Sequence, residues 1–219
     1  IPKRIRSFFF FFRSNLGLLY TAAWESWKSL LQEKYPDASP AAVLALHSAG
    51  DFLQWHPHLH CIALDGLVLP DGSVIKVELD PVKLTKRFAD LVLEALLKLE
   101  LITQDIVDNM NSWEHSGFSV HIGEVIPYSD IAQLQFVARY LRKCPISNER
   151  ITLINPDSNC TVELHSYKNE SHKSKMFTPL EFLAALSAHV PARWEQMTRF
   201  MGAYSCRTRG AARILKAQS

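Results

Sequence analysis

The sequence has 219 residues, of which 47% are hydrophobic and 21% charged, enough apolar material for one complete hydrophobic core. Lys and Arg number 24 against 22 for Asp and Glu, so the composition excludes an overwhelming positive field. Isolated cysteines at Cys61, Cys144, Cys160 and Cys206 exclude a zinc ribbon or a small disulfide scaffold. The apolar run 8–12 is far shorter than a bilayer span. We therefore expect a single domain in the reducing cytoplasm, with no membrane partner.

Hydrophobic periodicity predicts the elements of the first half of the chain. Apolar residues of 16–35 recur at helical spacing, and Pro36 and Pro40 close that helix. The run 42–47 fits more than one type of element. Further along the chain we expect the apolar, histidine-rich stretch 52–64, then two antiparallel strands at 67–69 and 74–77 flanked by turns at Asp65-Gly66 and Asp71-Gly72.

The second half mixes helices with short strands in the same way. The pattern predicts a helix at 84–99, a strand at 118–126, a helix at 131–143 capped by Ser129 or Asp130, a hairpin of 151–154 with 161–167, and a helix at 179–189 capped by Thr178. Together these elements indicate an α+β fold in which helices flank a central antiparallel sheet.

A histidine cluster is the most informative segment. His58 and His60 are alternate residues of a predicted strand, so both side chains lie on one face and can bind one metal ion. A carboxylate often completes such a site for hard ions, and Asp51 lies seven residues upstream of His58. Pro57 cannot donate to a ladder, which predicts that regular pairing begins at His58 and that His56 is placed differently.

The other histidines are weaker candidates. Each of them is isolated in the sequence, and an isolated histidine is more often a surface or hydrogen-bonded residue than a ligand. Among them, His121 lies in a predicted strand and is the reserve for the third metal ligand. The set comprises His47, His115, His121 and His165.

The helix at 131–143 carries a second candidate group. Its predicted packing stripe contains Ile131, Leu134, Val137, Ala138 and Leu141. Phe136, Tyr140 and Lys143 lie away from that stripe, which places a phenol and an ammonium one turn apart. A phenol beside a cation and a metal-polarised phosphate is a competent nucleophile, although an isolated tyrosine there is more often a surface residue.

Taken together, these segments resemble a known family. His58-Leu59-His60 and Tyr140-Leu141-Arg142-Lys143 resemble the His-hydrophobic-His and Tyr-x-x-Lys motifs of the HUH endonuclease superfamily. A longer ordered set is similar to the transposases of rolling-circle bacterial insertion sequences. It comprises 2–6, Gly50-Asp51 with 55–60, Asp65-Gly66, 117–121, 138–140 with Pro145-Ile146, and 207–210.

The resemblance implies a specific chemistry. An antiparallel sheet would carry the histidine pair, and a helix beside it the catalytic tyrosine. His58, His60 and Asp51 would hold Mg²⁺ or Mn²⁺, Tyr140 would attack single-stranded DNA to form a 5′-phosphotyrosine, and Lys143 would position the phosphate. Residues 1–40 would form an N-terminal helical segment, 41–150 the catalytic core, and 151–219 a hairpin, helix and basic tail. No small-molecule substrate is expected.

Two departures from the family pattern keep alternatives open. Members with two catalytic tyrosines place them four residues apart, and Phe136 stands at the earlier position. The cysteine-rich zinc-binding region and the strand that usually precede the segment matched by Ile1-Pro2 are also missing, so the sequence is expected to be a fragment. An inactive DNA-binding remnant is one alternative, and an unrelated zinc hydrolase using His56, His58 and His60 is another.

Overall fold

A central three-stranded antiparallel sheet organises the computed structural model, which describes residues 1–155, 160–166 and 173–210. Its strand order is β2-β1-β8, formed by Trp55–Ala63, Ala41–Ala49 and Thr198–Gly202. The segment 42–47, which fitted more than one element, is the middle strand. Its residues are mostly buried and pair on both sides, as a central strand requires. The predicted α+β class and antiparallel sheet are confirmed.

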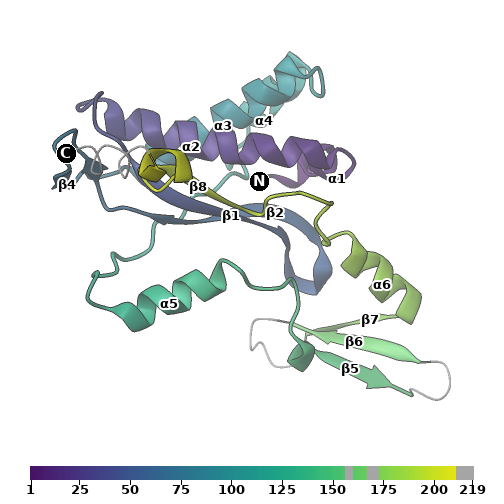
Figure 1. The fold of residues 1–219 in the computed structure, drawn as a ribbon. Coiled ribbons are helices and arrows are strands. Elements are labelled where there is room, and N and C mark those ends of the chain that lie inside the picture. Colours follow the sequence, from purple (N-terminus) through teal and green to yellow (C-terminus); the bar gives the residue numbers. More distant parts are fainter. Residues whose placement is uncertain (156–159, 167–172, 211–219) are drawn as a thin grey trace.

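Helices cover one face of this sheet (Figure 1). They are the short α1 (Ser7–Phe10), α2 (Leu16–Gln32), α3 (Pro81–Lys98) and α4 (Gln104–Asn111). The main core lies between these helices and the sheet, and it includes Tyr20, Leu44, Leu46, Leu96 and Met110. The predicted helices at 16–35 and 84–99 are confirmed, although the first ends at Gln32 and the second begins at Pro81 behind the Asp80 cap.

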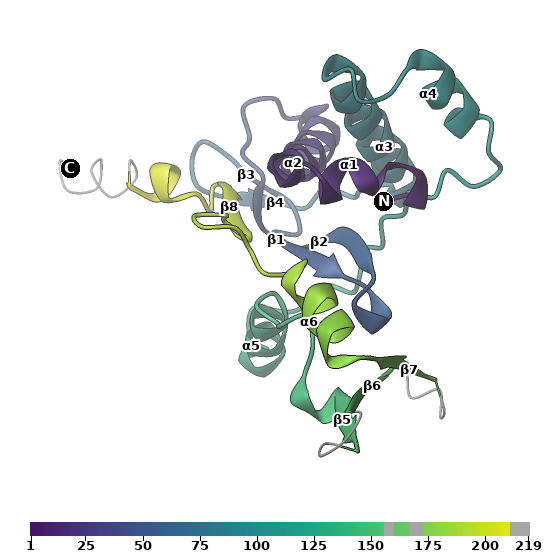
Figure 2. The same cartoon turned by 90° about the vertical axis from the view of Figure 1, so that its right-hand side faces the viewer.

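The opposite side of the sheet faces α5 (Ile131–Tyr140), and a smaller unit lies beyond it (Figures 1 and 2). That unit is a three-stranded antiparallel sheet of β5 (Ile151–Ile154), β6 (Thr161–His165) and β7 (Ser174–Phe177), packed against α6 (Pro179–Ser187). The predicted hairpin and the Thr178-capped helix are confirmed here, except that Tyr167 lies outside the described residues. The last two basic residues of the predicted tail, Arg213 and Lys216, also lie outside them.

The predicted strand at 118–126 is wrong. The segment 118–127 has no helix or strand assignment in the structure. Phe118 packs edge-on against Phe88 of α3, with ring centroids 5.9 Å apart, and Val120 packs against a second core cluster. Phe118 and Val120 therefore pack onto the core without joining a sheet ladder, whereas Ile122 and Val125 are exposed. His121, the reserve metal ligand, is exposed in this segment.

A β-hairpin and several short 3-10 turns complete the fold. The hairpin, predicted from its Asp-Gly turns, consists of β3 (Leu67–Val68) and β4 (Val74–Ile75). The turns are Lys3–Ile5, Arg13–Asn15, Asp51–Leu53 and Asn148–Arg150. No described helix is both long and apolar enough to cross a membrane.

Candidate metal and tyrosine site

Three histidines converge on the face of the central sheet that looks toward α5. The ligand nitrogens of His47, His58 and His60 all lie within 4.8 Å of one another. The register explains the cluster, because β1 and β2 are antiparallel and His47 pairs directly with His58. His60 follows two residues later on the same face of β2. The sequence analysis had treated His47 as a weak candidate, and the structure instead makes it the third member of the group.

Pro57 has the effect expected from the sequence. Continuous pairing of β2 with β1 begins at His58. An irregularity between His47 and Ala49 separates this continuous ladder from the single pair of Ala49 with Trp55. β2 is an edge strand, where a buried proline is tolerated because its missing N–H leaves no ladder partner unpaired. His56 lies outside the triad, with its ring 5.3 Å from that of His58.

Hydrogen bonds orient two of the three imidazole rings. His58 Nδ1 lies 2.7 Å from the His56 carbonyl oxygen, and His47 Nε2 lies 3.2 Å from the Leu141 carbonyl oxygen. A carbonyl only accepts, so each of these nitrogens must carry the proton and the other nitrogen of each ring keeps its lone pair. Within the described part of the chain, His60 Nε2 is buried without any hydrogen-bond partner. Nitrogens that keep their lone pairs, and one that is buried without a partner, fit a metal site better than a self-contained core.

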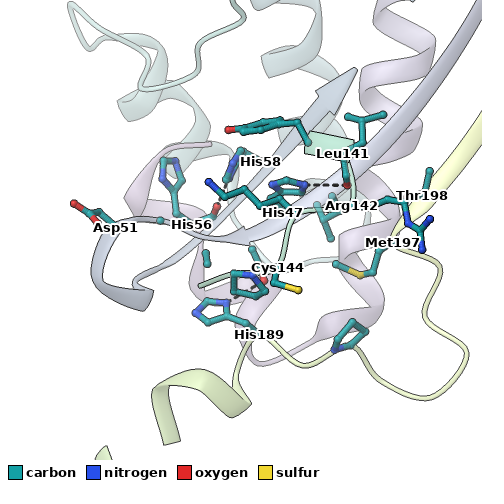
Figure 3. Close-up of a pocket in the computed structure, with 18 residues that line it drawn as sticks. His47, Asp51, His56, His58, Leu141, Arg142, Cys144, His189, Met197 and Thr198 are labelled. Atoms are coloured by element: carbon teal, nitrogen blue, oxygen red, sulfur yellow. Dashed lines mark hydrogen bonds between the residues drawn. The ribbon is translucent and has the colours of Figure 1, made fainter. Parts of the chain in front are cut away.

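Asp51, the carboxylate predicted to be the third ligand, has a different setting. Its Oδ1 accepts a hydrogen bond of 2.7 Å from Arg150, and its Oδ2 accepts one from Ser166. Arg150 is buried, and its Nε also donates to the His165 carbonyl oxygen. Figure 3 shows the Asp51 side chain pointing away from His47 and His58. Asp51 thus joins the turn between β1 and β2 to the small sheet, and the structure does not bring it to the histidines.

Tyr140 lies directly beside the triad. Its ring centroid is 5.0 Å from that of His60 and 6.0 Å from that of His47. It is the last residue of α5, and the next residue, Leu141, is buried and accepts the hydrogen bond from His47. This helix agrees with the prediction in part. Asp130 caps it, and Leu134 and Val137 of the predicted stripe are half-buried. Ile131 and Ala138, which were expected in the same stripe, are exposed.

Lys143 also reaches the tyrosine. It follows the end of α5, and its Nζ lies 5.6 Å from the centroid of the Tyr140 ring. Phe136, at the position of a second tyrosine in some relatives, is 67% exposed. The helix therefore presents one phenol to the histidines, with one ammonium beside it.

A cavity of about 740 Å³ opens next to these groups. His47, His58, Tyr140 and Lys143 line one part of it, and the edge of β1 beyond its pairing with β8 lines another. His189 closes the latter part, where its two ring nitrogens lie 3.0 Å from Ser48 Oγ and 3.0 Å from the Leu53 carbonyl oxygen (Figure 3). The phenol of Tyr140 and the imidazoles of His47 and His58 are thus accessible from the cavity. His189 was not predicted, because a histidine at a helix end has no distinctive spacing.

Burial keeps the clustered imidazoles neutral. It lowers the pKa of His60 to about 4, with a further contribution from His47 and His58, and it also lowers the pKa of both these neighbours. Neutral imidazoles are the form that binds metal, so the cluster is ready for an ion at neutral pH.

The same pKa shifts predict how stability depends on pH without metal. Unfolded imidazoles take up protons below about pH 6.5, whereas folded His60 does so only near pH 4. The unfolded state thus binds more protons, and the metal-free protein should lose stability as pH falls through this window. Urea unfolding at about pH 7.5 and about pH 5 measures the effect. His60→Gln should show a smaller fall, and equal midpoints for the parent protein at the two pH values would contradict the assignment.

Comparison with known proteins decides the family. Residues 41–212 match the family "Y2_Tnp", described as "Putative transposase". The chain belongs to this transposase family. The match spans the histidine strands, α5 and β8, and so includes every residue of the site. The predicted kinship with insertion-sequence transposases is confirmed.

A curated relative agrees with this assignment. The transposase for insertion sequence element IS801 of Pseudomonas savastanoi pv. phaseolicola is 20% identical over 171 residues, which is 72% of this chain. The match covers 42% of that protein, so the chain spans less than half the length of its relative. No solved structure matches the chain.

Proposed function

We propose that this transposase chain cleaves single-stranded DNA and becomes joined to the cut end through Tyr140, in rolling-circle transposition. The observation that carries the proposal is the placement of the Tyr140 ring 5.0 Å from His60, beside three histidines whose nitrogens converge. Membership of the transposase family makes DNA the substrate to test first. The resemblance to HUH endonucleases supplies the reaction class.

His47, His58 and His60 would hold the metal ion. This differs from the set expected from sequence, since His47 takes the place of Asp51. Three nitrogen donors suit a first-row transition ion better than Mg²⁺, which prefers oxygen ligands. We therefore propose Mn²⁺ in preference to Mg²⁺. When bound, the ion supplies positive charge that offsets the charge on the scissile phosphate.

Tyr140 provides the nucleophile. Its phenolic oxygen forms the new bond to phosphorus while the bond from phosphorus to the 3′-oxygen breaks. The phenol proton leaves to solvent, and the leaving 3′-oxygen takes up a proton from solvent. The products are a 5′-phosphotyrosine and a 3′-hydroxyl, so the energy of the phosphodiester is kept for strand transfer. Lys143, whose Nζ lies 5.6 Å from the centroid of the phenol ring, would stabilise the phenolate and the phosphate. The Leu141 carbonyl holds His47 and thereby fixes the end of α5 at the histidines.

The test is incubation with 5′- and 3′-labelled single-stranded DNA from an insertion-sequence end, followed by denaturing electrophoresis. The label on the 3′ side of the cut should migrate with the protein, and the other label should be released with a free 3′-hydroxyl. Mn²⁺ should support more product than Mg²⁺, and a duplex of the same sequence should give none. DNA binding without any adduct would instead support the inactive DNA-binding alternative.

A further inference from the structure

Five consecutive phenylalanines near the N-terminus are divided sharply by the fold. Phe9 is fully buried in the main core, and Phe8 packs against the same cluster. The next three residues turn outward: Phe10 is 42% exposed, Phe11 73% and Phe12 55%. Folding ordinarily removes such rings from water, so three adjacent exposed rings indicate a surface with a partner.

These exposed rings are connected to the cavity of the proposed active site. Phe11 contacts Phe10 edge-on at 5.2 Å between centroids, and Phe10 contacts Trp55 at 5.3 Å. Trp55 is stacked on His189, with centroids 5.7 Å apart and planes 18° apart, and His189 lines the cavity. Ring contacts therefore lead from His189 at the cavity through Trp55 and Phe10 to Phe11, and Phe12 is the next exposed ring in the chain. Phe10, Phe11, Phe12 and Trp55 are here called the aromatic strip.

Trp55 is held rigidly and anchors the strip. Its Nε1 donates to the Arg6 carbonyl oxygen at 3.2 Å, and the Arg13 guanidinium lies 5.4 Å from its ring centroid. Arg13 is in turn paired with Glu195 at 2.9 Å. Trp55 is thus occupied by protein contacts, and the outer rings of Phe11 and Phe12 are the ones available for stacking.

Positive charge accompanies the strip. Lys3 and Arg4 are exposed in the 3-10 turn that precedes α1, and neither forms an ion pair with a described residue. Exposed aromatic rings and unpaired cations on consecutive segments are a combination that binds single-stranded nucleic acid, since bases stack on the rings and cations contact the phosphates. A second copy of the chain, which carries a net charge of +2, would gain little from the cations.

We propose that the aromatic strip is a stacking platform for the single-stranded DNA that extends from the scissile phosphate out of the cavity. Bases would stack on Phe11 and Phe12, and Lys3 and Arg4 would contact the phosphates beside them. The strip lies outside the metal and tyrosine groups, so it sets affinity for the flanking nucleotides rather than chemistry. This inference rests on the proposed function only in taking single-stranded DNA as the substrate.

Binding of a fluorescein-labelled oligothymidylate of about 20 nucleotides, followed by fluorescence anisotropy, tests the platform directly. The double variant Phe11→Ala with Phe12→Ala should bind about tenfold or more weakly, and Phe11→Trp should retain affinity. Tyr35→Ala is the matched control, because Tyr35 is 42% exposed and lies after α2, away from the strip. Melting curves followed by circular dichroism confirm that each variant is folded.

Salt dependence separates the two contributions. Lys3→Ala with Arg4→Ala should reduce the slope of log affinity against log salt by about 1.4, whereas the phenylalanine variants should lower affinity at unchanged slope. Binding of the phenylalanine variants at parental affinity would overturn the platform. A change in oligomeric state by light scattering, with DNA affinity unaltered, would overturn it in favour of a contact between copies. Neither readout requires cleavage, so failure of the proposed chemistry is seen separately, as binding without adduct.

Discussion

Tyr140→Phe is expected to abolish covalent attachment to DNA, lowering adduct yield by at least about a thousandfold while leaving DNA binding intact. The change removes only the hydroxyl. The side chain is 40% exposed and packs through its ring against His60, so the fold and the ring contacts should survive. Nothing else on α5 can replace the lost oxygen, because the exposed aromatic residue one turn earlier is Phe136.

A nearby tyrosine provides the matched control for that experiment. Tyr128 precedes α5 and is 90% exposed, but it does not line the cavity. Tyr128→Phe should therefore form adduct at the parental level. Adduct from the Tyr140→Phe protein at parental yield would show that another residue is the nucleophile.

His47→Ala is expected to weaken metal binding by about a hundredfold, because it removes a proposed direct ligand. Even residues that only support ligands contribute tenfold to a hundredfold. Calorimetric titration with Mn²⁺ measures the loss. His58→Ala should behave alike, since both side chains belong to the converging group.

Asp51→Ala discriminates between the ligand expected from sequence and the one that the structure brings in. It should leave metal affinity within about twofold, but it should lower the free energy of unfolding by roughly 2–4 kcal/mol. Asp51 accepts hydrogen bonds from Arg150 and Ser166, and its loss leaves the buried guanidinium of Arg150 with less compensation. A large loss of Mn²⁺ affinity in Asp51→Ala, with unchanged affinity in His47→Ala, would restore Asp51 as the ligand.

Local patterns carried much of the prediction. The helices at 16–32 and 81–98, the strand holding His58 and His60, and the small hairpin of β5 and β6 follow from periodicity, caps and turns, which are properties of short segments. The pairing of Tyr140 with the histidines came from the family resemblance. Periodicity alone gave no reason to place α5 against β2.

What sequence could not supply was the register between distant residues. His47 reads as an isolated histidine until β1 is paired with β2, and only that pairing sets it opposite His58. Counting back from the turn would not have given this register, because an irregularity between His47 and Ala49 shifts the pairing by one residue. β8 was missed for a similar reason: Thr198–Gly202 has little alternation, and its pairing with β1 joins segments more than 150 residues apart.

Asp51 shows how proximity in sequence can mislead. The backbone turns sharply after Gly50, and Phe52 and Leu53 adopt left-handed conformations with φ of 53° and 56°. This turn carries the Asp51 carboxylate toward Arg150 and the small sheet. A seven-residue spacing from His58 was compatible with a shared site, but Asp51 instead accepts hydrogen bonds from Arg150 and Ser166.

The most direct measurement is the mass of the DNA-linked peptide. The adduct formed on single-stranded DNA with Mn²⁺ is digested with nuclease and protease, and the peptides are sequenced by mass spectrometry. We predict a single peptide with a nucleotide phosphate attached to the Tyr140 oxygen. A nucleotide mapped to any other residue, or cleavage that leaves no nucleotide on the protein, would contradict the phosphotyrosine account.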